Sequence, residues 1–154
     1  MSESTASPTS SNSTAPDAAP KGARTPRRAA APRTVLVAAA LDVLLLLVFV
    51  LIGRNSHDEG FSVLGALNTW WPFLLGLAVG WVATRAWRYP FEVVLPGIPI
   101  WLFTVAVGML FRTISGQGVA VSFVIVTLIV TGVFLLGWRL LARVTVKRRA
   151  RSAR

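Results

Sequence analysis

Residues 34–52 form an apolar run of nineteen residues, of which fourteen are Val, Leu, Ile or Phe. As an α-helix this run would be about 28 Å long, which matches the roughly 30 Å hydrocarbon core of a bilayer. The run contains one ionisable residue, Asp42. An aspartate at the bilayer centre costs about 3 kcal/mol, and the apolar side chains outweigh it at roughly 0.3–0.6 kcal/mol each. The run is therefore predicted to cross a membrane as a helix.

Three further apolar runs follow, at residues 70–87, 98–111 and 119–138. With 54% hydrophobic and 14% charged residues, the chain is too apolar to be an ordinary soluble domain. The predicted fold class is all-α: a polytopic membrane protein whose residues 34–143 form a four-helix transmembrane bundle. The third run is short, and Pro96, Gly97 and Pro99 at its start indicate an interrupted helix, unless residues 93–95 also enter the membrane.

The connection between the first two spans is predicted to be a loop with a short helix in the membrane interface. Apolar residues between positions 61 and 67 have the spacing of such a helix. The second span is expected to begin at Trp70, with Thr69 as its N-cap and Pro72 in its first turn.

Glycine, tryptophan and arginine residues predict how the spans pack. Gly76 and Gly80 form a G-x-x-x-G pair, which favours a close helix contact within the chain over a dimer seam. The tryptophans are expected to lie in interfacial belts or between helices. Arg139 and Arg143 are expected to snorkel to the interface at the end of the fourth span.

The two ends of the chain are polar. Residues 1–33 are rich in Ser, Thr, Ala and Pro and are predicted to be a disordered basic N-terminal tail, and residues 144–154 to be a basic cytoplasmic C-terminal tail. Of the sixteen Lys and Arg residues, fourteen lie on the two terminal flanks and the second loop, and two lie on the other loops. Both termini are therefore predicted to be cytoplasmic and the protein to lie in the cell membrane. The basic tails favour anionic lipids of the inner leaflet as partners, and not nucleic acid.

Asp42 is the candidate intramembrane polar site. Ala38 and Ala39, one turn earlier, are small enough to admit a neighbouring helix, so this side of the span is expected to face the bundle. One interpretation is a proton relay or cation ligand, since an ionisable residue within a span is often functional. The other is a buried neutral acid or the packing partner of a polar side chain. The sequence leaves both open.

A candidate extracytoplasmic polar site comprises Arg54, Ser56 and His57, which follow the first span, and Arg112, which ends the third. One interpretation is an anion site, with Arg54 as ligand and His57 changing charge near neutral pH. The favoured interpretation is a helix end anchored by a snorkelling arginine and a polar turn. Arg112 is expected to pair with an acid of the first loop, to join Arg54 around an anion, or to act as an interfacial anchor alone, which is favoured.

No residue type points to catalysis. The chain has no cysteine and one histidine, so it offers neither a thiolate nucleophile nor a Cys- or His-based metal cluster. No catalytic, cofactor-binding or metal residues are predicted, and no cofactor, so an enzyme is disfavoured. The prediction is a non-enzymatic packing or partner-binding module. The alternative is a proton, ion or small-solute translocator acting as a homo-oligomer, because four helices are few to enclose a pathway.

The two pairs of spans share landmarks. In each pair the first span exits at an arginine, Arg54 or Arg112, and the second span returns to a Gly-Trp pair, 80–81 or 137–138. A parallel internal repeat is one interpretation of this pattern.

Several motifs together resemble a known family. They are Asp42, Gly53-Arg54-x-Ser56-His57, Trp71-Pro72-Phe73, Gly80-Trp81, Pro96-Gly97 with Trp101, Gly108 through Arg112, and Gly137-Trp138-Arg139. Over residues 34–143 the chain resembles domain-of-unknown-function family 3054, a family of small prokaryotic membrane proteins. The resemblance implies a four-span membrane protein, and it implies no activity, ligand or partner.

Overall fold

The structure, a computed structural model, describes residues 30–55 and 62–152, which fold into helices joined by short connections. The helices are α1 (Pro32–Asn55), α2 (Val63–Thr84), the 3-10 turn η1 (Ala86–Arg88), the π-helical segment η2 (Val93–Gly97), α3 (Ile98–Ile114) and α4 (Val121–Ser152). Four stretches are long and apolar enough to cross a membrane: Pro32–Arg54, Val63–Thr84, Val93–Ile114 and Val121–Thr145. The chain is an integral membrane protein, as its sequence predicts.

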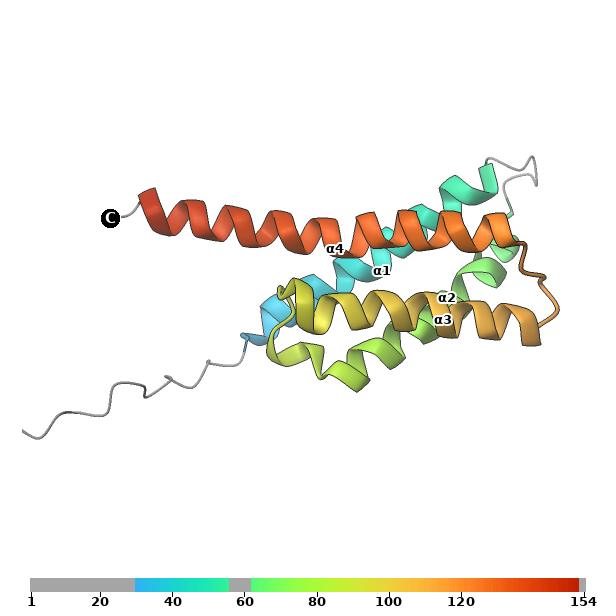
Figure 1. Cartoon of the computed structure of the whole chain (residues 1–154), viewed down its shortest axis with the longest axis horizontal. Coiled ribbons are helices and arrows are strands. Elements are labelled where there is room, and N and C mark those ends of the chain that lie inside the picture. The colour runs from blue at the N-terminus through green and yellow to red at the C-terminus, as the bar shows by residue number, and fades with distance from the viewer. Residues whose placement is uncertain (1–29, 56–61, 153–154) are drawn as a thin grey trace, which may run out of the picture.

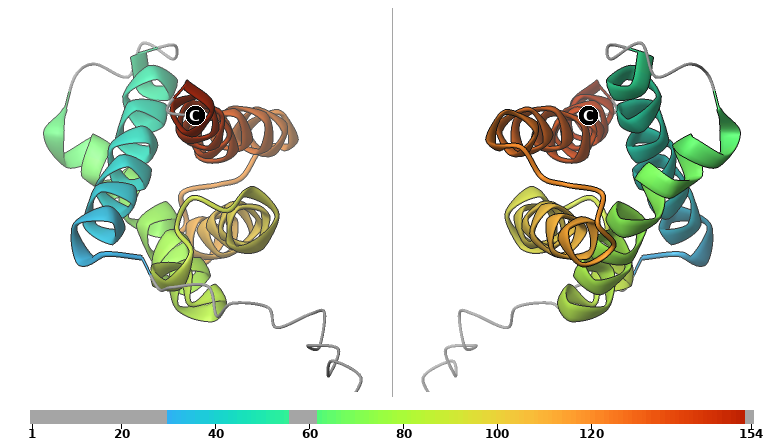
Figure 2. Two further views of the ribbon diagram at one scale, coloured as in Figure 1. Left: turned by 90° about the vertical axis from the view of Figure 1, so that its left-hand side faces the viewer. Right: turned by 90° about the vertical axis from the view of Figure 1, so that its right-hand side faces the viewer.

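The four long helices pack in a ring. α1 contacts α2, α2 contacts α3, α3 contacts α4, and α4 returns to α1. Seen along the bundle, the four helices surround a common interior (Figure 2). The start of α1 and the end of α4 lie at the same end of the bundle, and the α3–α4 connection lies at the opposite end (Figure 1). We call these the terminal end and the loop end.

The closest contact in the bundle is between α2 and α3. A Cβ atom on Gly76 would lie 2.7 Å from the backbone oxygen of Thr104, and one on Gly80 would lie 2.9 Å from the Cα of Ile100. Only glycine lets two helix backbones approach so closely. The prediction that this glycine pair serves a contact within the chain is confirmed.

Aromatic and aliphatic side chains fill the bundle interior. Leu46, Phe49 and Val50 of α1 meet Phe73 of α2, whose ring crosses that of Phe49 edge to face at 5.6 Å. A Cβ on Gly108 of α3 would lie 2.5 Å from the Phe73 ring, so this glycine makes room for it. These contacts hold α1, α2 and α3 together in the half of the bundle nearer the loop end.

The predicted start of the second span is wrong. α2 begins at Val63, and its N-cap is Ser62, whose Oγ accepts a hydrogen bond from the backbone N–H of Gly65 at 3.3 Å. Thr69 lies within the helix and donates to the Gly65 carbonyl, and Pro72 lies in the helix interior and not in its first turn. Val63, Leu64 and Leu67, expected in a separate interfacial helix, continue directly into the span, so these residues form one helix with it instead of two.

The third span starts with irregular backbone, as its proline and glycine residues predict. Leu95 within η2 has an extended conformation (φ −137°, ψ 112°), and the Leu95–Pro96 peptide is cis. A Cβ on Gly97 would lie 3.2 Å from the Cδ of Arg139, so η2 packs directly against α4. Irregular backbone at this depth requires a protein cover, which α4 provides.

α4 is longer than the fourth span predicted from the sequence. It continues without a break from Val121 to Ser152, so the apolar span and most of the basic C-terminal segment share one helix. Its last turns extend beyond the bundle at the terminal end (Figure 1). The N-terminal tail up to residue 29 lies outside the described residues.

Candidate functional site

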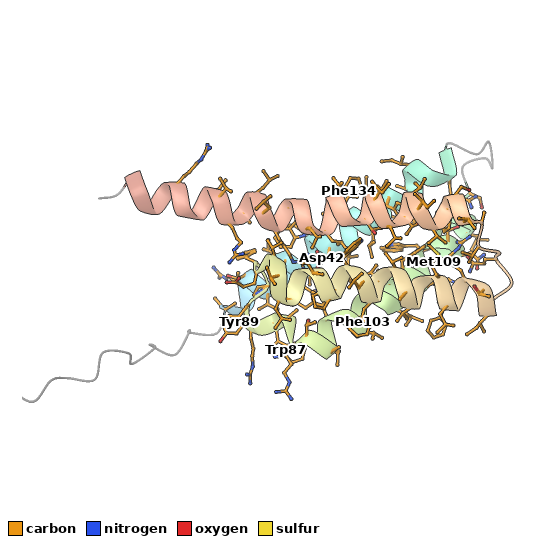
Figure 3. The ribbon with its side chains drawn as sticks, in the orientation of Figure 1. Asp42, Trp87, Tyr89, Phe103, Met109 and Phe134 are labelled. Atoms are coloured by element: carbon orange, nitrogen blue, oxygen red, sulfur yellow. The ribbon has the colours of Figure 1, made fainter. Side chains whose placement is uncertain are left out.

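The most polar part of the described bundle interior is an ion pair between Asp42 of α1 and Arg139 of α4. Both side chains are 0% exposed. The Arg139 Nη1 donates to Asp42 Oδ1 at 2.8 Å, and Nη2 donates to Oδ2 at 2.6 Å. This is the bidentate arrangement in which a guanidinium binds a carboxylate most strongly. Asp42 therefore faces the bundle, as Ala38 and Ala39 predict, and it lies toward the terminal end (Figure 3).

Two tryptophans complete the shell around the carboxylate. The indole Nε1 of Trp81 in α2 donates to Asp42 Oδ2 at 2.9 Å, and that of Trp138 in α4 donates to Oδ1 at 2.8 Å. Each oxygen thus accepts one guanidinium and one indole hydrogen bond. A carboxylate offers about four lone-pair positions, so the four donors use all of them. We call this four-residue group the Asp42 clasp: Asp42, Trp81, Trp138 and Arg139.

Arg139 also connects the Asp42 clasp to the backbone. Its Nε donates to the Pro90 carbonyl at 3.1 Å, and its Nη1 donates to the Leu135 carbonyl at 2.7 Å. The guanidinium lies 4.7 Å from the ring of Trp138, close enough for a cation–π contact, and Phe91 packs edge to face on that ring. One buried side chain therefore joins α1, α4 and the connection that precedes η2.

The prediction that Arg139 snorkels to the interface is wrong. Because α4 continues to Ser152, Arg139 lies well inside the helix and turns inward to Asp42. The neighbouring prediction for Arg143 is also incomplete, since its guanidinium binds the carboxylate of Glu92 at 2.5 Å on the partly exposed surface. The signal that could have identified Arg139 was charge: an acid buried in one span requires a partner from another.

The loop end of the bundle contains a cavity of about 730 Å³ between α1, α4 and the α3–α4 connection. Arg54 and Arg112 both line it, so the structure brings together two residues of the candidate extracytoplasmic site. Ser56 and His57 of that site lie outside the described residues. Arg112 donates to the Gln117 Oε1 at 2.9 Å, and its guanidinium lies 4.6 Å from the Phe123 ring.

The sequence of the bundle matches one family over most of its length. A family model described as a protein of unknown function, DUF3054, matches residues 39–142. The chain belongs to this family. The match confirms the resemblance drawn from the sequence motifs. Within the chain, the DUF3054 segment starts three residues before Asp42 and ends three residues after Arg139, so the whole Asp42 clasp lies inside it. No curated protein and no solved structure matches this DUF3054 chain.

Proposed function

We propose that the protein is a non-enzymatic membrane module, a packing or partner-binding component whose polar interior holds helices together. The observation that carries the proposal is the saturation of Asp42, whose two oxygens accept four hydrogen bonds from Arg139, Trp81 and Trp138. A carboxylate that relays protons or binds a cation needs a lone pair facing water or the ion. The burial of both charges supports a structural role in place of a catalytic or transport role.

We further propose that both termini lie in the cytoplasm and that the membrane is the cell membrane. The asymmetry of the arginines and lysines supports this orientation. The basic end of α4 would then meet the inner leaflet, where anionic lipid attracts a cationic side chain by about 1 kcal/mol per residue. The helical continuity of α4 to Ser152 supports such a contact, because the helix carries the charges away from the bundle.

A second candidate function is the translocation of a proton, an ion or a small solute by a homo-oligomer. The observation that favours it is a set of buried threonines, Thr104, Thr127 and Thr131, that adds polar groups to the interior between the Asp42 clasp and the loop end. The Thr127 hydroxyl is buried without a hydrogen-bond partner in the described structure. The hydroxyls of Thr104 and Thr131, however, donate to carbonyls of their own helices, which favours packing.

Cysteine labelling separates the two functions, because the native chain has no cysteine. We would replace Ala38, beside Asp42, and Thr131 singly by Cys; both native side chains are fully buried. Ser115→Cys on the exposed loop end is the matched control. Each variant in sealed vesicles is treated with a membrane-impermeant thiol reagent, and unfolded samples confirm that every thiol can react.

The structural role predicts that Ser115→Cys reacts while Ala38→Cys and Thr131→Cys stay protected. A pathway for solutes requires water at the depth of Asp42. Labelling of Ala38→Cys or Thr131→Cys at a rate close to that of the control would therefore overturn the proposed function in favour of translocation.

A further inference from the structure

The cavity at the loop end has a polar mouth and an apolar interior. Arg54 and Gln117 lie near its outer end, where α1 ends and the α3–α4 connection runs. Farther from the mouth its walls are Phe49 of α1 and Val126 and Val130 of α4, and Val126 is 52% exposed, so the cavity is open to the outside of the bundle along this wall. A site built only for a small ion would not need these apolar walls. The gradient from charge to hydrocarbon fits an amphiphile with an anionic head.

The length of the cavity matches one leaflet of a bilayer. Residues 119 and 120 of the connection line the cavity, and along α4 the lining runs from Ser122 to Val130, which rises about 12 Å at 1.5 Å per residue. Half of a bilayer hydrocarbon core is about 15 Å thick. An acyl chain lying parallel to α4 would therefore extend from the charged mouth to the middle of the membrane. The cavity volume of about 730 Å³ lies within the range of ligand sites.

The charge at the mouth selects an anion of suitable shape. Two guanidinium groups, from Arg54 and Arg112, line the same cavity. The contacts of Arg112 with Gln117 and Phe123 hold its guanidinium in place against the cavity wall. The planar fork of arginine binds phosphate oxygens in pairs, and the attraction is stronger next to hydrocarbon than in water.

We propose that this cavity binds one anionic phospholipid from the leaflet at the loop end of the bundle. The lipid phosphate lies between Arg54 and Arg112, and one acyl chain lies along the Val126–Val130 face of α4. The lipid is a fixed component of the fold and fills the space between α1 and α4. This inference goes beyond the packing role proposed above and requires only that the helices cross a membrane.

The experiment is lipid counting by native mass spectrometry on the full chain purified in mild detergent and exposed to phosphatidylglycerol or phosphatidylcholine. The background is a variant in which Lys147, Arg148, Arg149 and Arg151 are replaced by Gln, because the basic end of α4 also attracts anionic lipid. Some phosphatidylglycerol is bound by the native chain but not by this variant, and it dissociates at high salt. This fraction measures the inner-leaflet contact proposed above. Phosphatidylglycerol that stays bound is assigned to the cavity only where the cavity variants below lose it, because the N-terminal tail also carries basic residues.

Two variants address the cavity, each with a matched control. Arg54→Gln with Arg112→Gln removes the charges, and Arg85→Gln with Arg88→Gln removes two exposed arginines at the terminal end. Val126→Phe fills the apolar wall, whereas Val133→Phe adds the same volume to a residue of α4 that is 64% exposed and outside the cavity. We expect one retained phosphatidylglycerol, and a loss of affinity of about tenfold or more in both cavity variants and in neither control.

The phospholipid proposal is overturned by equal retention of phosphatidylcholine. It is also overturned if Val126→Phe retains phosphatidylglycerol as the background does, because an acyl chain then does not use this wall. Displacement of the lipid by millimolar inorganic phosphate would assign the arginines to a free ion instead. If the double arginine variant does not fold, Val126→Phe and the phosphatidylcholine comparison still decide the question.

Discussion

At the scale of single residues, the ion pair of Asp42 and Arg139 decides how the interior of the bundle is arranged. Both charges are removed from water, which is costly, and the pair offsets that cost because its geometry is bidentate and two of the three remaining N–H groups of Arg139 also find acceptors. Such a pair does not by itself guarantee stability. It does make each partner depend strongly on the other.

This dependence predicts a pattern in a mutant cycle. Asp42→Leu leaves the Arg139 guanidinium buried without its counter-ion, and we expect it to destabilise the fold by about 3–5 kcal/mol. Arg139→Met should do the same. The double variant should recover a large part of the loss, because an apolar pair no longer carries a buried charge. Thermal unfolding in detergent measures the effect.

The pair of Glu92 and Arg143 is the control for this cycle. These side chains are 28% and 35% exposed, so their ion pair at 2.5 Å is partly solvated. Replacing either by Gln should change stability by about 0–1 kcal/mol. Equal losses from the two pairs would show that burial of Asp42 and Arg139 is not what makes them important.

The sequence predicts only part of this site. The small side chains of Ala38 and Ala39 are enough to predict that Asp42 faces other helices. Its partners are not predictable from the same pattern, because Trp81 lies within an apolar run and Trp138 and Arg139 lie at the end of another, where interfacial anchors are equally common. The Gly-Trp pairs indicate an internal repeat but not a shared ligand, and the structure brings both tryptophans to one carboxylate.

At the scale of helices, the contact of α2 with α3 depends on the absence of side chains at Gly76 and Gly80. A Cβ on Gly80 would meet the backbone of α3, which cannot yield as a flexible side chain can. Gly137 of α4 has nothing within 4 Å of the corresponding position. The two helical glycines therefore differ in their surroundings and not in their secondary structure.

Alanine substitution at these two glycines should change stability in opposite directions. Gly80→Ala should force α2 and α3 apart and cost about 1–3 kcal/mol, the usual effect of overpacking. Gly137→Ala should stabilise the fold by about 0.5–1 kcal/mol, because alanine favours a helix over glycine. Melting temperatures of the two variants in the same detergent provide the comparison. A stabilised Gly80→Ala variant would contradict the backbone contact.

The sequence predicts the existence of the four helices better than their ends. Apolar length determines that a segment crosses a membrane, and this property is read directly from composition. Ends depend on local hydrogen bonds, such as the Ser62 cap that starts α2. α4 passes its predicted end because nothing in the basic segment breaks a helix: residues 139–152 contain neither proline nor glycine.

At the scale of the whole molecule, the bundle has two ends of different chemical character. Asp42 lies toward the terminal end, beyond which the basic extension of α4 continues (Figure 3), and the loop end carries the cavity. The described residues contain four candidate spans, and an even number of crossings would bring the start of α1 and the end of α4 to one face of a membrane. The sequence alone predicts which face, because the positive-inside rule depends on the count of charges and not on packing.

Reporter fusions test this orientation. A fluorescent protein that matures only in the cytoplasm, fused after Arg154, should fluoresce, and alkaline phosphatase at the same position should be inactive. A fusion inserted after Ser115, in the α3–α4 connection, should give the opposite result. Phosphatase activity after Arg154 would show that the molecule is inverted.

Asp42 and Arg139 are 97 positions apart, at the beginning and near the end of the membrane segment. A ribosome adds about 5–20 residues each second, so the carboxylate is synthesised about 5–20 s before its guanidinium partner. During biosynthesis, every nascent chain that includes Asp42 but does not yet include Arg139 carries an acid without its counter-ion. The bundle can neutralise its interior only when its last helix has left the ribosome.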